Sequence, residues 1–138
     1  MDTKKFLAAT IAGAVTMFFL GFAIYGNLLD AFMRANMSNV AVMKAEPDFA
    51  HLILAQVGWG AFLALVLGEW RGVTTFAAGA SAGALLGAIM GVAFDFEMFA
   101  TMNLMNFQGT CVDILVMAVR FGIAGGVVGQ VIGMVAKR

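Results

Sequence analysis

An aspartate and an arginine lie seven residues apart within a strongly apolar run near the C-terminus. The run CVDILVMAVRFGIAGGVVG, residues 111–129, holds Asp113 near its start and Arg120 well inside it. Seven residues are about two helical turns, so both side chains lie on one face of a helix, about 10 Å apart along its axis. An arginine in hydrocarbon costs roughly 2.5–3.5 kcal/mol, so Arg120 is expected to face other helices and find a partner there.

Six other polar residues are expected to join this pair at the same level of the molecule. They stand near the ends of the apolar segments or between them: Asp30, His51, Asp95, Glu97, Asn103 and Asn106. Two interpretations stay open. The cluster is either a buried network that fixes the register of the helices, or an outward-facing polar cavity that binds a polar or anionic solute with Arg120 at its floor.

Methionines repeat at helical spacing in two of the connections between apolar segments, where they could form a copper site. They are Met33 and Met37 in the first connection, and Met98, Met102 and Met105 in the second. Thioethers prefer Cu(I), and spacings of three or four residues bring side chains together on a helix. Methionine is also a flexible filler of apolar interiors. Cu(I) is therefore the only cofactor that the sequence suggests, as a lesser alternative.

Other chemistry finds little support in the sequence. A single histidine and a single cysteine give no catalytic triad and no CxxC pair. No phosphate-binding loop, HExxH sequence or dinucleotide fingerprint is present. The formal net charge is zero, so no basic field would attract nucleic acid. We expect neither catalytic residues nor enzymatic activity.

The composition places these residues in a membrane protein. Apolar residues make up 62% of the 138 residues and charged residues 12%, against roughly 45–50% and about 25% in soluble domains. Four apolar segments cover residues 6–29, 49–67, 74–94 and 109–136, and each is close to the roughly 20 residues that cross a bilayer as a helix. The sequence predicts one all-α domain over residues 1–138, an integral membrane protein folded as an antiparallel bundle of four transmembrane helices.

Basic residues outside the apolar segments predict the orientation of this bundle. With both termini in the cytoplasm, the inner side carries Lys4, Lys5, Arg71, Lys137 and Arg138, and the outer side carries Arg34 and Lys44. An excess of basic residues marks the cytoplasmic side. We therefore expect a multi-pass protein with its N- and C-termini inside.

Glycines recur at helical spacing in the last two apolar segments, strictly every four residues in the third and at intervals of three or four in the fourth. The third segment holds Gly79, Gly83, Gly87 and Gly91, and the fourth holds Gly122, Gly126, Gly129 and Gly133. Stripes of small residues let helix backbones approach closely in lipid. The third and fourth segments are therefore predicted to pack as a tight hairpin, and the same stripes could also face a second subunit.

A resemblance to a group of known proteins runs over most of the chain and rests on three stretches: GFAIYGNLLDAFM, KAEPDFAHLILAQVGWG and NLMNFQGTCVDILV. They resemble, in the same order, segments of a group of small four-helix bacterial inner-membrane proteins of unknown function. The resemblance implies the four-span fold and a location in the bacterial inner membrane. It implies no activity, so no catalytic residue is carried over.

Taken together, the sequence favours a non-enzymatic structural or accessory protein of the membrane. Its expected partners are the lipid bilayer and either further copies of itself or a larger membrane complex, met through the glycine-rich helix faces. The alternative is a small transporter or binding protein for a polar or anionic solute, built around Arg120. Cu(I) handling by the methionines is the lesser alternative.

Overall fold

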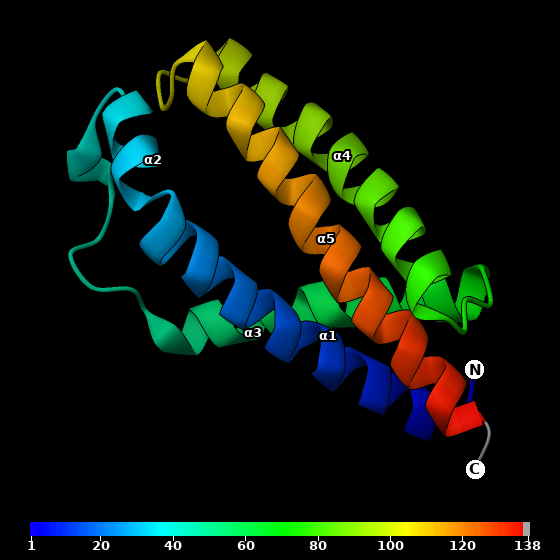
Figure 1. Ribbon diagram of the computed structural model, residues 1–138. Helices are drawn as coiled ribbons and strands as arrows, with labels where there is room; N and C mark the ends of the chain where they lie inside the picture. Colours follow the sequence, from blue (N-terminus) through cyan, green and yellow to red (C-terminus); the bar gives the residue numbers. More distant parts are fainter. Residues whose placement is uncertain (137–138) are drawn as a thin grey trace.

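The computed structural model describes residues 1–136, and four long apolar helical stretches dominate it (Figure 1). They are Thr3–Leu28, Phe49–Trp70, Phe76–Thr101 and Phe107–Ala136. With a rise of about 1.5 Å per residue, each is longer than the roughly 30 Å of bilayer hydrocarbon. The prediction of an all-α chain with four helices long and apolar enough to cross a membrane is confirmed.

The first two stretches each combine an α-helix with a π-helical end. Helix α1 (Thr3–Ala23) continues into η1 (Ile24–Leu28), and α3 (Phe49–Leu63) continues into η3 (Ala64–Trp70). The other two are single α-helices, α4 (Phe76–Thr101) and α5 (Phe107–Ala136). Between η1 and α3 lie the short helix α2 (Asp30–Asn36) and the 3₁₀ turn η2 (Val40–Val42).

Each long stretch begins at a polar side chain that accepts a hydrogen bond from the backbone of the first turn. The acceptors are Asp2, Asp48, Thr75 and Asn106, which bind the N–H groups of Lys5, His51, Ala78 and Gly109 at 2.9–3.3 Å. Such caps satisfy donors that a helix start leaves free. The bond from the Lys5 N–H also lowers the pKa of the Asp2 carboxyl below its ordinary value.

Helix α4 continues seven residues beyond Phe94, the predicted end of the third segment. Asp95 and Glu97 lower the hydropathy there, which is why the predicted segment ends early. The helix persists to Thr101 because Phe96 and Phe99 pack on Phe107 of α5, with ring centroids 6.2 and 5.8 Å apart. Asp95 and Glu97 therefore lie on a helix and not in a connection.

Helices α4 and α5 pack most closely, through glycines on both sides. A Cβ atom on Gly83 would overlap the carbonyl group of Phe121, and one on Gly129 would lie 2.5 Å from the Thr75 carbonyl oxygen. Carbonyl oxygens lie as close to Gly79, Gly87 and Gly133, and a Cβ atom on Gly91 would lie 3.1 Å from the Ile114 Cα. Residues early in α4 contact residues late in α5, so the two helices run antiparallel.

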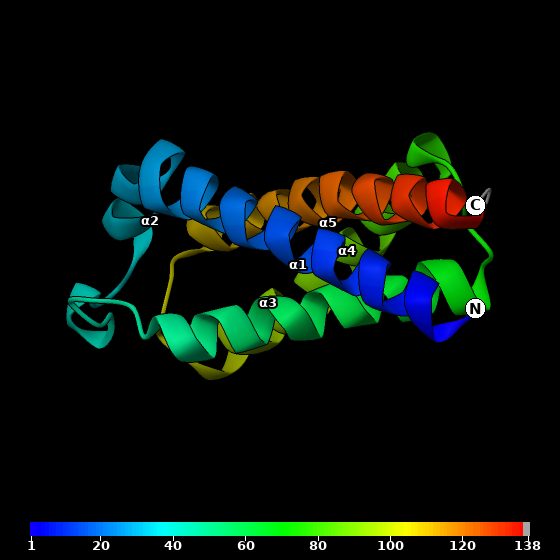
Figure 2. The same cartoon turned by 90° about the horizontal axis from the view of Figure 1, so that it is seen from below.

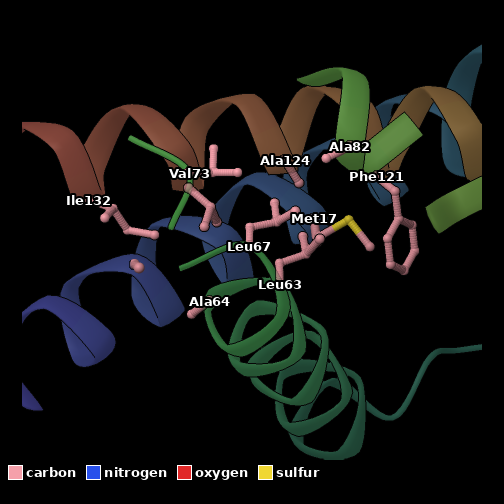
Figure 3. Close-up of a cluster of buried hydrophobic side chains, with 11 residues drawn as sticks. Met17, Leu63, Ala64, Leu67, Val73, Ala82, Phe121, Ala124 and Ile132 are labelled. Atoms are coloured by element: carbon pink, nitrogen blue, oxygen red, sulfur yellow. The ribbon is translucent and has the colours of Figure 1, made fainter. Parts of the chain in front are cut away.

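Helix α1 joins this hairpin to α3. It crosses α3 where Gly13 faces Gly60, and it packs on α5 where Gly13 also meets Val128. Helix α4 meets the rest of the described chain almost entirely through α5, so α5 lies between α4 and α1 (Figure 1). The main buried cluster fills the space between α1, α3 and α5, with Met17, Leu63 and Phe121 fully buried (Figure 3).

The connections divide the molecule into two ends (Figure 2). At the turn end lie the N-terminus, the end of α5 and residues 71–75, where Gly72 takes a left-handed backbone with φ of 62°. At the loop end lie residues 29–48 and 102–106. There the backbone N–H of Ser38 donates to Leu104 at 2.9 Å, and that of Asn106 donates to Asn36 at 2.9 Å, so the two connections are tied together.

Candidate functional site

Arg120 lies buried where α1, α3 and α5 meet, with 9% of its surface exposed. Its Nη2 donates to the Met17 carbonyl oxygen of α1 at 3.0 Å and to Gln56 Oε1 of α3 at 3.5 Å. Gly21 of α1 provides the room, because a Cβ atom there would lie 3.0 Å from Nη2. The arginine thus connects three helices, as an ionised group within an apolar helix requires.

Tyr25 links Arg120 to Asp113. The Arg120 guanidinium carbon lies 5.4 Å from the centroid of the Tyr25 ring, within range of a cation–π interaction. The Tyr25 hydroxyl donates a hydrogen bond to Asp113 Oδ1. Asp113 therefore connects to Arg120 through the aromatic side chain of Tyr25, which bridges the distance expected from their spacing.

Asp95 completes the cluster from α4. Its carboxyl group and that of Asp113 line the same small pocket of about 90 Å³. The remaining walls are mostly apolar and include Met98, Phe99 and Met105. Asp95, Asp113, Tyr25, Gln56 and Arg120 are called the polar cluster below.

Five of the predicted polar residues lie outside this cluster. Asp30 pairs with Arg34 at 2.8 Å, and both side chains are about half exposed. His51 binds its own cap residue Asp48 at 2.7 Å, with 81% of its side chain exposed. Glu97 and Asn103 are not buried by the rest of the described chain. Asn106 caps α5.

The predicted methionine ligands are also divided. Met98 and Met105 line the pocket beside Asp95, whereas Met102 is 55% exposed. Met33 and Met37 lie at α2, and the backbone of Met37 pairs with that of Met105. Within residues 1–136, no group of three or more His, Cys, Asp or Glu side chains is placed to hold a metal ion.

Tyr25, Gly21 and the Met17 carbonyl oxygen were missed by reasoning from the sequence. Tyr25 is the only tyrosine of the chain and lies near the end of a long apolar segment, which is the one signal that could have identified it. A backbone carbonyl carries no sequence signal, and neither does an isolated glycine that makes room for a distant side chain.

Within residues 1–136, Arg120 is buried and turned toward acceptors of its own chain. Its Nη2 is bound by the chain itself. The arginine lines neither the pocket at the two acids nor the apolar pocket of about 270 Å³ that Gln56 lines. The arrangement is thus suited to holding helices together and to binding positive charge at its acidic side. No protein family, no curated protein and no solved structure matches this chain.

Proposed function

We propose that this chain is a non-enzymatic multi-pass membrane protein that serves as a structural or accessory subunit. The observation that carries the proposal is the internal use of Arg120, which binds Met17 and Gln56 of its own chain. The remaining surface of the four long helices is largely apolar, with side chains such as Phe19, Ile89 and Leu115 more than half exposed. Such a surface suits lipid and neighbouring membrane helices.

The proposal includes a bacterial inner membrane and both termini in the cytoplasm. The four long apolar helices support a multi-pass membrane location, and the bacterial inner membrane is what the resemblance noted in the sequence implies. Lys4, Lys5 and Arg71 belong to the turn end, whereas Arg34 and Lys44 belong to the loop end, and the basic excess marks the cytoplasmic side. Lys137 and Arg138, counted on the same side from the sequence, lie outside the described residues.

The partner is a second copy of the chain or another subunit of a membrane complex. The glycine stripes were expected to offer the contact surface. A Cβ atom added to any of those eight glycines would lie within 3.2 Å of other atoms of the same chain, at Gly122 against Ala84 and at Gly126 against Phe76. The surface left for a partner is therefore the apolar outer face of the helices.

The solute-binding alternative receives less support from the geometry. An anion site at Arg120 would need the guanidinium group to line an opening. The Arg120 side chain is instead buried, and its Nη2 already donates to two acceptors of the chain. Cu(I) binding by Met98 and Met105 would need a third ligand, since Met102 is exposed. Both alternatives stay predictions; the experiment below separates solute binding from the accessory role.

Extraction from native membranes in a mild detergent, followed by cross-linking and mass measurement, tests the proposal. We expect a discrete complex larger than the 14.5 kDa chain. A monodisperse monomer that binds an anionic solute, with binding lost in Arg120→Gln and kept in Arg34→Gln, would support the solute-binding alternative instead. Arg34 is a suitable control because its ion pair with Asp30 is exposed.

A further inference from the structure

The polar cluster contains more acid than base. Asp95 and Asp113 are two carboxyl groups, Arg120 is one guanidinium group, and Tyr25 and Gln56 are neutral. If both acids were ionised, the cluster would carry one negative charge without a counter-charge. Within apolar helices an unpaired charge is strongly unfavourable. One further positive charge is therefore needed.

The hydrogen bonds of the cluster show where this charge is missing. Asp113 Oδ1 accepts from the Tyr25 hydroxyl. Asp95 Oδ2 is buried and finds no hydrogen-bond partner in the described chain. The hydroxyl group of Thr110, which also lines the pocket, already donates to the Asn106 carbonyl oxygen at 3.0 Å. The pocket thus holds a buried carboxyl oxygen that lacks a donor, close to a second carboxyl group.

Among the described residues, no other cation of the neighbouring elements faces the two acids. Arg120 on α5 is turned toward α1 and α3 by its bonds to Met17 and Gln56. At the loop end, Arg34 of α2 is paired with Asp30, and Lys44 is exposed in the connection before α3. The contact from η1 is made by Tyr25, whose hydroxyl group donates to Asp113.

We propose that Asp95 and Asp113 share one proton, which forms a carboxyl–carboxylate hydrogen bond between α4 and α5. The proton supplies the donor that Asp95 lacks and brings the cluster to neutrality. Two carboxyl groups held side by side cannot both ionise without strong repulsion, so such pairs retain a single proton. Binding a proton between the two carboxyl groups requires no movement of the side chains that line the small pocket.

The shared proton makes the loop end of the molecule sensitive to pH. The folded chain binds a proton that the unfolded chain, with two ordinary carboxyl groups, releases at neutral pH. The contribution of the pair to stability is therefore largest at acidic pH and falls as the pH rises through the range in which the pair loses its proton. When the proton is lost, the two carboxylates repel each other and separate the last turns of α4 from α5.

Infrared difference spectroscopy of the full chain in lipid vesicles tests the proposal, because the carbonyl stretch of a protonated carboxyl group is distinct from that of a carboxylate. We expect the protonated band in the wild type at neutral pH and its disappearance as the pH is raised toward about 9. Asp95→Asn and Asp113→Asn should each remove the band, and the matched control Glu97→Gln should keep it. Asparagine has the shape of a protonated aspartate, so both variants are expected to fold.

Absence of the band in the wild type at neutral pH, or its persistence in both asparagine variants, would overturn the proposal. A second measurement uses only the wild type, in case a variant fails to fold. Its melting temperature should fall over the same pH range in which the band disappears, and a melting temperature that is constant there would contradict the shared proton. Neither result depends on whether the protein is a subunit of a larger complex.

Discussion

Arg120 illustrates what can and cannot be read from single residues of this sequence. Its position in an apolar run predicts that it faces other helices and has a partner, and its two acceptors lie on α1 and α3. The identity of the partners is beyond prediction because one of them is a backbone carbonyl group. The spacing places Asp113 on the same face about 10 Å along the axis, and in the structure it connects to the arginine through Tyr25.

Replacing Arg120 by leucine should destabilise the fold by about 3 kcal/mol, because the acids of the polar cluster would lose their counter-charge and Gln56 its donor. Reversible unfolding in mixed detergent micelles measures this change. The control Arg34→Leu removes a half-exposed ion pair and should cost less than about 1 kcal/mol. Equal effects of the two substitutions would contradict the role assigned to Arg120.

Replacing Tyr25 by phenylalanine should cost about 0.6 kcal/mol and not more than about 1.7 kcal/mol, the average and the maximum for hydrogen bonds between membrane helices. The ring and its contact with Arg120 are kept, so only the hydroxyl donor to Asp113 is lost. The same unfolding assay in an Asp113→Asn background should show a smaller cost. If the two effects simply add, Tyr25 and Asp113 are not energetically coupled.

At the scale of elements, spacing predicts some contacts and misses others. The four-residue glycine repeat marks the faces by which α4 and α5 meet, because several small residues in phase give a recognisable stripe. The crossing of α1 and α3 uses one glycine from each helix, Gly13 and Gly60, and a single glycine has no period to detect. The π-helical turn η1 further shifts Tyr25 out of the 3.6-residue register that such reasoning assumes.

Two glycines on different helices provide a matched test of this packing. Gly83→Ala places a methyl group against the Phe121 carbonyl and should destabilise the fold by about 1–3 kcal/mol. Gly58→Ala, on a helix face with open space around it, should be neutral or stabilising by up to about 1 kcal/mol. Unfolding of both variants under the same conditions gives the comparison. A neutral Gly83→Ala would show that the hairpin can open at little cost.

At the scale of the molecule, hydropathy predicts the four long helices but does not predict which of these helices pack against each other. Each segment is apolar on most of its surface, so little besides the glycines and the charged residues of the fourth segment distinguishes a buried face from a lipid-facing one. The arrangement in which α5 lies between α4 and α1 depends on a few close approaches, such as Gly13 on Val128 and Gly21 on Arg120. These pairings join residues more than 90 positions apart, which one sequence cannot reveal.

The proposed orientation predicts which ends a membrane-impermeant thiol reagent can reach in intact cells. In a Cys111→Ser background, Ala45→Cys at the loop end should be labelled and Thr74→Cys at the turn end should not, because the two exposed residues would face opposite sides of the membrane. Labelling is read by gel shift, and lysed cells serve as the control in which both positions react. Labelling of Thr74→Cys alone in intact cells would reverse the orientation.

The left-handed turn at Gly72 separates two halves that each contain one helix pair, α1 with α3 and α4 with α5. Their mutual contacts, from α1 and η3 to α5 and through the two hydrogen bonds at the loop end, do not require the peptide link at Gly72. If the gene is divided after the codon for Gly72, we expect fragments 1–72 and 73–138 to associate in the membrane and to co-purify. Fragment complementation would then allow each half to be exchanged or labelled independently.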